Sequence, residues 1–181
     1  MNKSKIRSKI LKLRKNKFNK NLKVNLDKFI SFLKINTHNL KNLGGYYPSN
    51  YEIDDLEILC LLEKQHFKIS LPIVKKNNQM NFFKWSNKDP LKINKFGIPE
   101  PVSSKILYPD ILLVPLVGYD SNLNRLGYGG GFYDRYIEKI EKIKKVIKIG
   151  LAFSCQKIIS VPINQYDKKL DFIITEKEIL K

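Results

Sequence analysis

Apolar side chains return every three or four residues in several stretches of this chain, which is the period of a helix. Ile6, Ile10 and Leu13 are spaced 4 and 3 apart, so they would share one helix face. Asp54, with Glu57 three residues later, is typical of the start of a helix. Helices are therefore predicted near the start of the chain and at residues 22–33, 54–64 and 132–145.

Other stretches have the alternating or continuous apolar character of strands. Residues 67–71 alternate and stop at Pro72, so they predict a strand that ends there. Residues 111–117 are apolar without interruption, which is typical of a strand buried on both faces of a sheet. Residues 86–105 contain three prolines and predict irregular structure. Further strands are predicted just before Gly44 and at residues 82–85, 146–153 and 170–175.

The order of these elements indicates the fold class. Strands and helices alternate along the chain, which is typical of an α/β fold with a largely parallel sheet. The length of 181 residues suits one domain. We therefore expect a single three-layer domain over residues 1–181, in which helices flank a largely parallel sheet.

The chain is strongly basic, with 34 lysines and arginines against 17 aspartates and glutamates, for a net charge of +17. Such a field attracts anions, so nucleotide phosphates, nucleic acids and polyanionic metabolites are all candidate partners. A basic RNA-binding module is one hypothesis, in which aromatic side chains would stack on bases. The lysines are spread through every segment, however, and no RNA-binding motif is present.

Other classes of protein are disfavoured by what the sequence lacks. Its apolar runs are far shorter than the ~20 residues that a membrane-spanning helix needs. Cys60 and Cys155 are far apart and form no CxxC pair, so neither a disulfide framework nor a structural zinc site is expected. The first 26 residues have no acidic side chain. No apolar segment or cleavage site follows them, so we expect a cytoplasmic enzyme.

The most informative segment is glycine-rich and lies between a predicted strand and a predicted helix. It reads RLGYGGGFYDR and covers residues 125–135. Consecutive glycines let main-chain N–H groups approach an anion, and a helix N-terminus adds partial positive charge. Arg125 and Arg135 supply guanidinium groups that suit phosphate, and Asp134 supplies a carboxylate that suits Mg²⁺. The glycines alone would also fit a tight strand-to-helix connection, so both interpretations stay open on composition alone.

The same segment resembles the signature of the 5-formyltetrahydrofolate cyclo-ligases, also called methenyltetrahydrofolate synthetases. Lys3 and Arg7 match the basic pair that opens these proteins. Other segments are similar to the family in order and spacing: residues 51–54, 96–101 and 108–120, and the pattern of Val161, Pro162, Asp167 and Asp171. The resemblance spans nearly the whole chain and implies an ATP-dependent enzyme of one-carbon metabolism.

The resemblance implies that ATP and 5-formyltetrahydrofolate become 5,10-methenyltetrahydrofolate, ADP and phosphate in the presence of Mg²⁺. The formyl oxygen would attack the γ-phosphate to give an iminium phosphate, and the N10 amine would then close the ring as phosphate leaves. We expect a monomer without nucleic-acid or membrane partners, whose lysines would favour polyglutamylated folates. A nucleotide-binding relative without cyclo-ligase activity is the remaining alternative.

The resemblance also assigns roles to individual residues. Catalysis would involve Arg125, Tyr133 and Asp134, and Mg²⁺ would be held by Asp134 and Asp167. ATP would be bound by Lys3, Arg7, Arg125, Gly127, Tyr128, Gly129, Gly130, Gly131, Phe132 and Tyr133. The folate would lie against Tyr47, Glu52, Tyr128, Phe132 and Trp85. Many members of the family have lysine where this chain has Gly130, so charge neutralisation here would depend more on Lys3, Arg7, Arg125, Arg135 and the metal.

Overall fold

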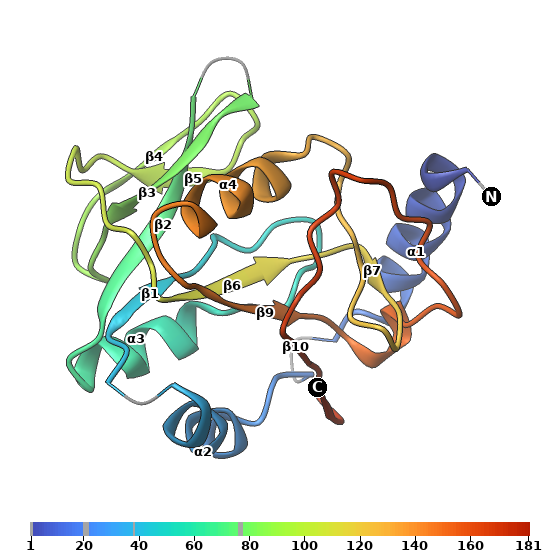
Figure 1. The fold of residues 1–181 in the computed structure, drawn as a ribbon, viewed down its shortest axis with the longest axis horizontal. Coiled ribbons are helices and arrows are strands. Elements are labelled where there is room, and N and C mark those ends of the chain that lie inside the picture. The colour runs from blue at the N-terminus through green and yellow to red at the C-terminus, as the bar shows by residue number, and fades with distance from the viewer. Residues whose placement is uncertain (1, 20–21, 38, 76–77) are drawn as a thin grey trace.

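The computed structural model describes residues 2–19, 22–37, 39–75 and 78–181, and its centre is one mixed sheet (Figure 1). Across the sheet the strands are β11 (Ile179–Leu180), β10 (Phe172–Ile174), β9 (Ile147–Leu151), β6 (Ile111–Pro115), β1 (Asn42–Gly44), β2 (Lys68–Val74) and β3 (Met80–Lys84). The five strands from β10 to β2 are parallel, and the strand at each edge is antiparallel to its neighbour. The predicted largely parallel sheet is confirmed.

Four α-helices and two small hairpins complete the part of the chain that is described. The helices are α1 (Lys3–Lys17), α2 (Leu26–Asn36), α3 (Leu56–Lys64) and α4 (Phe132–Glu141). One hairpin pairs β4 (Leu91–Ile93) with β5 (Pro99–Pro101), and the other pairs β7 (Gly118–Tyr119) with β8 (Arg125–Leu126). A short 3-10 helix, η2 (Ser154–Gln156), follows β9. None of the described helices is long and apolar enough to cross a membrane.

The central strand β6 shows why the domain has three layers. Its residues point alternately to the two faces of the sheet, and both faces are buried. Ile111 and Leu113 pack with α2 and α3, whereas Leu112 and Val114 pack with α4. Figure 1 shows α2 and α3 on one side of the sheet and α4 on the other. The expected strand with two buried faces is therefore confirmed.

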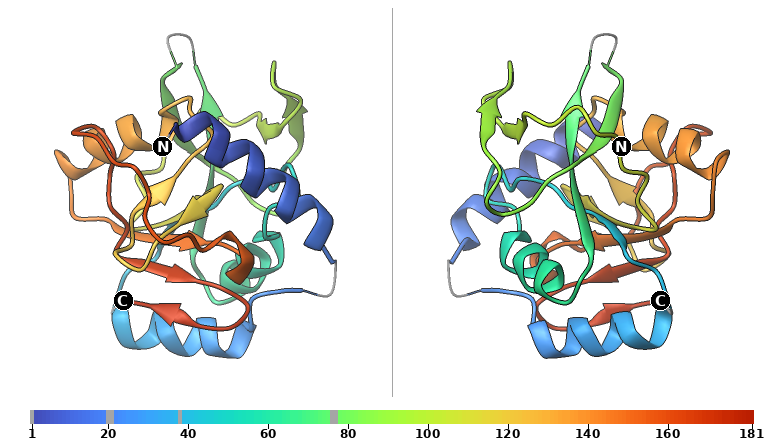
Figure 2. Two further views of the ribbon diagram at one scale, coloured as in Figure 1. Left: turned by 90° about the vertical axis from the view of Figure 1, so that its right-hand side faces the viewer. Right: turned by 90° about the vertical axis from the view of Figure 1, so that its left-hand side faces the viewer.

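The strand order changes direction between β1 and β6. From β1 the chain passes through α3 to β2 on one side, and from β6 it passes through α4 to β9 on the other side. In open α/β sheets, ligands bind beyond the carboxyl ends of the strands at such a point. Helix α1 lies across this end of the sheet, beyond the ends to which β6 and β9 point (Figures 1 and 2).

The face of α1 that packs on the domain differs from the predicted one. Ile6 and Ile10 are buried against Val117, as expected for apolar residues on one helix face. Leu13, however, is 37% exposed, and Arg14 is buried in the position four residues after Ile10. The spacing of 4 continues the buried stripe, and it is a charged residue that occupies the third position.

Several other boundaries were predicted wrongly. Strand β2 continues through Pro72 to Val74, because its second half pairs with β3 alone and a proline is tolerated where one edge is unpaired. Residues 86–105 contain the β4–β5 hairpin rather than only irregular structure. Helix α3 begins at Leu56, with Asp55 at its N-cap, while the Asp54 carboxylate accepts a hydrogen bond from the Leu56 amide.

Candidate active site

The glycine-rich segment connects β8 to α4 at the carboxyl end of the sheet. Its backbone has positive φ angles at Gly129 (103°) and Gly131 (66°), and Gly131 is the N-cap of α4. A side chain at either position would be strained, because L-residues rarely adopt these angles. The backbone conformation therefore requires glycine at these positions, and this conformation leads the segment into the N-terminus of α4.

The main-chain amides of this segment are free to bind a ligand. Within the described part of the chain, none of the N–H groups of residues 127–131 donates a hydrogen bond. They precede the first turn of α4, whose own N–H groups carry the positive end of the helix dipole. A run of unpaired amides at a helix N-terminus is the arrangement that binds phosphate groups.

Lys3 and Arg7 of α1, which the resemblance assigns to the nucleotide, have different partners in the structure. The Arg7 Nε donates to the Gly127 carbonyl at 2.7 Å, and a Cβ on Gly129 would lie 3.3 Å from the Arg7 guanidinium carbon. The Lys3 ammonium is 2.5 Å from an Asp167 carboxylate oxygen. Lys3 and Arg7 are one turn apart, so both reach the same end of the sheet from one helix face.

The two predicted magnesium ligands come from separate segments that the structure joins. The Asp134 Oδ1 accepts from the Arg125 Nη2 at 2.6 Å and from the Lys168 amide at 3.1 Å. The Asp167 Oδ2 accepts from Lys3 and from the Asn164 amide. Among the described residues, no hydrogen bond uses the second oxygen of either carboxylate. Each carboxylate therefore keeps one oxygen of the kind that Mg²⁺ prefers together with phosphate and water, and no cluster of three or more His, Cys, Asp or Glu side chains suited to a metal ion occurs among the described residues.

Tyr133 and Arg125 form the inner wall behind the glycine-rich segment. The Arg125 guanidinium carbon is 5.9 Å from the centre of the Tyr133 ring, and both Arg125 and the Tyr133 hydroxyl are buried. Burial raises the pKa of Tyr133 well above its ordinary value, and the nearby Asp55 and Glu52 carboxylates raise it further. Tyr133 is therefore a neutral phenol at physiological pH. The hydroxyl has no hydrogen-bond partner in the described part of the chain.

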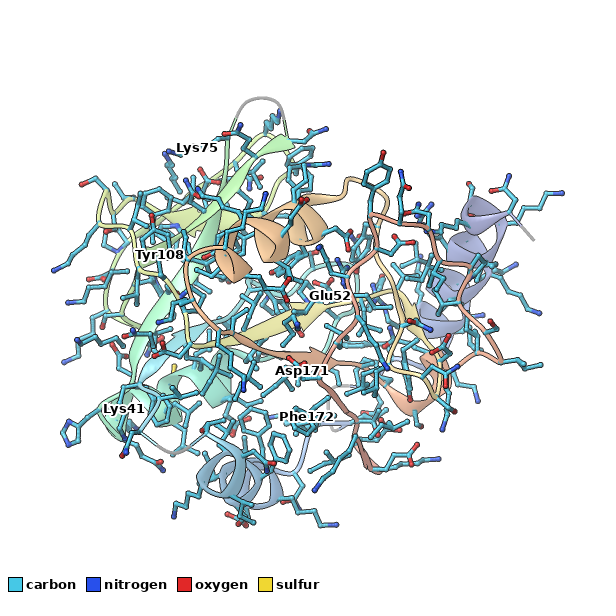
Figure 3. The ribbon with its side chains drawn as sticks, viewed as in Figure 1. Lys41, Glu52, Lys75, Tyr108, Asp171 and Phe172 are labelled. Carbon is cyan, nitrogen blue, oxygen red and sulfur yellow. The ribbon has the colours of Figure 1, made fainter. Side chains whose placement is uncertain are left out.

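Glu52 lies in a second part of the site, where buried side chains meet from three segments. Its Oε1 accepts from the Tyr128 hydroxyl at 2.6 Å, and its Oε2 accepts from the Ser49 amide at 2.7 Å. The Arg14 Nη2 in turn donates to the Tyr128 hydroxyl at 2.6 Å. Figure 3 labels Glu52 in the interior of the molecule, whereas Lys41 and Lys75 are at its periphery. We call Arg14, Tyr128 and Glu52 the buried relay.

The charge of Glu52 reflects opposing effects. Burial raises the pKa of its carboxyl group above the ordinary value, and the hydrogen bonds from Tyr128 and Ser49 and the positive charge of Arg14 offset only part of this rise. Burial also raises the pKa of Tyr128, so the phenol stays protonated. Its hydroxyl can therefore donate a hydrogen bond to the Glu52 carboxyl group. The Tyr128 hydroxyl is enclosed even though the residue as a whole is 40% exposed, which leaves its ring open to a ligand.

The other predicted folate contacts, Tyr47, Phe132 and Trp85, lie in different surroundings. Tyr47 is half-buried just after β1, and the Phe132 ring meets the exposed Phe96 ring edge to face at 6.0 Å between centroids. Trp85 is 4% exposed and belongs to the core cluster that includes Leu59, so the structure gives it a packing role and does not bring it to the buried relay.

Two arginines have hydrogen-bond partners that the sequence did not predict. Arg135 donates from its Nη2 to the Gly130 carbonyl at 2.5 Å and to the Asn78 carbonyl at 3.0 Å, so it braces the glycine-rich segment from outside. Arg14 was not among the candidate residues, because a run of lysines and arginines on a helix is usually a solvated face. The available signal was the spacing of 4 from Ile6 through Ile10 to Arg14.

Comparisons with known proteins identify the family of this chain. Residues 1–176 match the model of the 5-formyltetrahydrofolate cyclo-ligase family. A 5-formyltetrahydrofolate cyclo-ligase from Haemophilus influenzae is 34% identical over 72% of this chain and 73% of its own length.

Solved structures of related proteins have the same fold. The NMR structure of a 5,10-methenyltetrahydrofolate synthetase from Aquifex aeolicus superimposes with a TM-score of 0.80 at 30% identity, covering 99% of this chain and 92% of its own. A 5,10-methenyltetrahydrofolate synthetase from Mycoplasma pneumoniae superimposes with a TM-score of 0.76 at 25% identity, covering 98% and 100%. With a family match over nearly its full length and a shared fold, this chain belongs to the 5-formyltetrahydrofolate cyclo-ligase family.

Proposed function

We propose that this protein converts 5-formyltetrahydrofolate to 5,10-methenyltetrahydrofolate with ATP as co-substrate and Mg²⁺ as cofactor, releasing ADP and phosphate. The observation that carries the ATP requirement is the run of unpaired amides at residues 127–131, placed between Arg7 and Arg125. This arrangement suits a triphosphate, and the adjacent relay suits a reduced pterin. The two halves of the site are joined by Tyr128, which belongs to the glycine-rich segment and contacts Glu52.

The chemistry requires that a poor electrophile be activated. The formyl oxygen attacks the γ-phosphorus, a new P–O bond forms, and the bond to ADP breaks, which leaves an iminium phosphate. The N10 amine then attacks the activated carbon and loses its proton, and the C–O bond breaks with release of phosphate. Such a reaction needs alignment and charge neutralisation more than covalent help from the protein.

The side chains of the site divide this work. The amides of residues 127–131 hold the phosphates, and Lys3, Arg7 and Arg125 offset their negative charge. Asp134 and Asp167 would hold Mg²⁺, which supplies further positive charge at the phosphoryl oxygens. Tyr133 supports Arg125 through its ring.

The folate half of the site is polar on one side and aromatic on the other. The Glu52 carboxylate accepts hydrogen bonds from the amino-pterin ring, and the rings of Tyr128 and Phe132 offer stacking surfaces. Surface lysines favour folates with polyglutamate tails, because added negative charge is attracted by a protein of net charge +17. If the preference for polyglutamylated folates did not depend on ionic strength, this last point would be wrong.

The direct test is an absorbance assay for methenyltetrahydrofolate with purified protein, 5-formyltetrahydrofolate, ATP and Mg²⁺. We expect turnover that stops when either ATP or Mg²⁺ is omitted. Asp134→Asn should lower kcat by roughly 100- to 1,000-fold, because one fixed charge at the phosphoryl group is lost. Asp27→Asn, on the outer part of α2, is the matched control and should leave kcat unchanged.

The alternatives give different results in the same preparation. A nucleotide-binding relative without cyclo-ligase activity would bind ATP but form no methenyltetrahydrofolate. A basic RNA-binding module would bind RNA tightly, with an affinity that falls steeply with salt in a filter-binding series. Either result, obtained with folded protein, would overturn the proposed function.

A further inference from the structure

Arg14 is the most deeply buried charged side chain of the site, and the cyclo-ligase chemistry described above gives it no role. It is 1% exposed, although the other basic residues of its helix are exposed or half-buried. Burying a cation is costly unless hydrogen bonds and an opposite charge compensate. The position of this arginine therefore depends on the partners that it meets.

Those partners come from three different parts of the chain. The Arg14 Nη1 donates to the Leu116 carbonyl at 3.1 Å, just after β6. Its Nη2 donates to the Asn50 carbonyl at 2.7 Å and to the Tyr128 hydroxyl at 2.6 Å. Arg14 thus ties α1 to the carboxyl end of β6, to the turn before Glu52 and to the glycine-rich segment.

The chemistry of these groups sets the direction of the relay. A guanidinium group has donors only, so the Tyr128 oxygen must accept from Arg14. A phenol has a single hydrogen, and at Tyr128 that hydrogen is then directed at the Glu52 Oε1, 2.6 Å away. Arg14 therefore fixes both the position of the Tyr128 hydroxyl and the group to which it donates.

The turn that carries Glu52 is held in an unusual backbone conformation. Asn50 and Tyr51 have φ angles of 48° and 62°, in the left-handed region that residues other than glycine rarely adopt. The Arg14 hydrogen bond to the Asn50 carbonyl and the Ser49 hydrogen bonds to Glu52 hold the turn at both ends. Strain of this kind persists only where surrounding contacts enforce it.

We propose that Arg14 is a positioning residue for the folate: it fixes the Tyr128 hydroxyl and, through that hydroxyl, the Glu52 carboxyl group, so that this group is placed to accept hydrogen bonds from the pterin ring. The proposal rests on the proposed function and adds a role for a residue of α1 that does not contact phosphate. It also makes α1 a shared support, since Arg7 serves the nucleotide half and Arg14 the folate half of one site.

The groups that act on the charge of Glu52 come from every element around it. They are Arg14 of α1, Tyr128 of the glycine-rich segment, Ser49 of its own turn, Tyr46 after β1, Asp55 before α3 and Tyr133 of α4. Arg14 is the cation that lowers the pKa of Glu52 most. Removing its charge therefore raises the pKa of Glu52 further, and the carboxyl group gains its proton at a higher pH.

The test compares Arg14→Gln and Arg14→Lys with wild type in steady-state kinetics from pH 5.5 to 8.5. For Arg14→Gln we expect the KM for 5-formyltetrahydrofolate to rise about 10-fold with the KM for ATP unchanged. The rise in folate KM on acidification should begin at a higher pH than in wild type. Arg14→Lys keeps the charge, so its pH profile should return toward wild type while its KM stays a few-fold high.

Three results would overturn the proposal. They are an unchanged folate KM in Arg14→Gln, equal losses for both substrates, and a pH profile that superimposes on that of wild type. Absence of turnover in wild type would instead overturn the proposed function, so the two failures are distinguishable. A merely structural role for Arg14 would not move the pH profile of one substrate.

A second variant covers the case in which Arg14→Gln does not fold. Tyr128→Phe keeps the ring but removes the hydroxyl that links Arg14 to Glu52, and no buried charge is lost. It should raise the folate KM several-fold and shift the same pH profile in the same direction. Tyr51→Phe is the matched control, since this tyrosine is 44% exposed, lies next to Glu52 and packs against Phe18. An unshifted profile in Tyr128→Phe, matching that of Tyr51→Phe, would contradict the relay.

Discussion

The two halves of the proposed site are built in different ways. The proposed phosphate half is one continuous segment whose unpaired main-chain amides would hold the phosphates, and its shape is set by two glycines with positive φ angles. The folate half is made of side chains from α1, from the turn after β1 and from the glycine-rich segment, which meet in a buried relay. A site of main-chain groups is sensitive to backbone shape, whereas a site of buried side chains is sensitive to charge. Substitutions in one half should therefore affect the kinetic constants for ATP, and substitutions in the other half those for the folate.

Among the changes that distinguish the two halves, the largest expected effect comes from changing the backbone of the phosphate half. Gly129→Ala places a Cβ at a φ of 103° and within 3.3 Å of the Arg7 guanidinium, so the segment must change its path. We expect kcat/KM for ATP to fall about 100-fold, which is the size of effect seen when an aligned main-chain donor is lost. Steady-state kinetics with ATP as the varied substrate would measure it.

Gly97→Ala is the matched control for that change. Gly97 also has a positive φ, of 74°, but nothing lies within 4 Å of a Cβ placed there. Both substitutions cost about 1 kcal/mol of stability through strain, so their melting temperatures should fall together. If Gly97→Ala lost as much activity as Gly129→Ala, the loss would reflect stability and not the geometry of the phosphate site.

This contrast also explains what could be predicted from the sequence. Lys3, Arg7 and residues 125–134 could be named as candidates from the sequence because the proposed phosphate half is local, and one motif contains most of it. Arg14 was missed because its role depends on contacts with Leu116, Asn50 and Tyr128, which are 36 to 114 residues away in the chain. Its surroundings of lysines are those of a solvated helix, and only packing against the sheet shows otherwise.

The fold, like the site, could be predicted from the sequence where the signal is local. Strand β6 was recognised because both faces are buried, so its apolar run needs no partner to be identified. The β4–β5 hairpin was missed because its residues are mostly half-buried or exposed and its prolines are typical of loops. Pairing with β3 decides how far β2 extends, and a local pattern that stops at Pro72 does not contain this information.

The next largest effect should come from the charge of the folate half. Glu52→Gln keeps the shape of the side chain and an oxygen for the Tyr128 hydroxyl, but removes the negative charge. A hydrogen bond to a charged group contributes about 1.5–3 kcal/mol, so the folate KM should rise at least about 10-fold. The KM for ATP should stay within twofold, because the phosphates are held by the other half.

The matched control for that variant is Glu57→Gln on α3. Glu57 forms an exposed ion pair with Lys23, and surface pairs of this kind contribute at most about 1 kcal/mol. Its kinetics should match those of wild type. Equal changes in the KM for folate and the KM for ATP after Glu52→Gln would show that the two halves are not separable.

A smaller effect is expected where a predicted folate contact is instead part of the core. Trp85 is 4% exposed, and its indole N–H has no partner in the described part of the chain. Trp85→Phe opens a small cavity but removes this unpaired donor, so the net loss should be about 1 kcal/mol, or roughly 2–4 °C in Tm. Thermal unfolding measures this. If the KM for folate rose more than threefold, Trp85 would be a folate contact after all.

The smallest effect concerns the buried acid behind both halves. Asp55 is fully buried, its Oδ2 accepts from the Tyr46 amide, and its Oδ1 has no partner among the described residues. Burial raises its pKa well above the ordinary value of 3.8, so the folded protein keeps a proton that the unfolded chain releases. The contribution of Asp55 to stability is therefore present at low pH and is lost as pH rises through the raised pKa.

Asp55→Asn tests this sign, because the amide cannot ionise and can still accept from the Tyr46 N–H. Thermal unfolding of both proteins from pH 4 to 9 should give similar Tm values at the acidic end. The variant should become the more stable protein by a few degrees at the alkaline end, at roughly 2–4 °C for each ~1 kcal/mol. A Tm difference that does not vary with pH would mean that Asp55 does not titrate within this range.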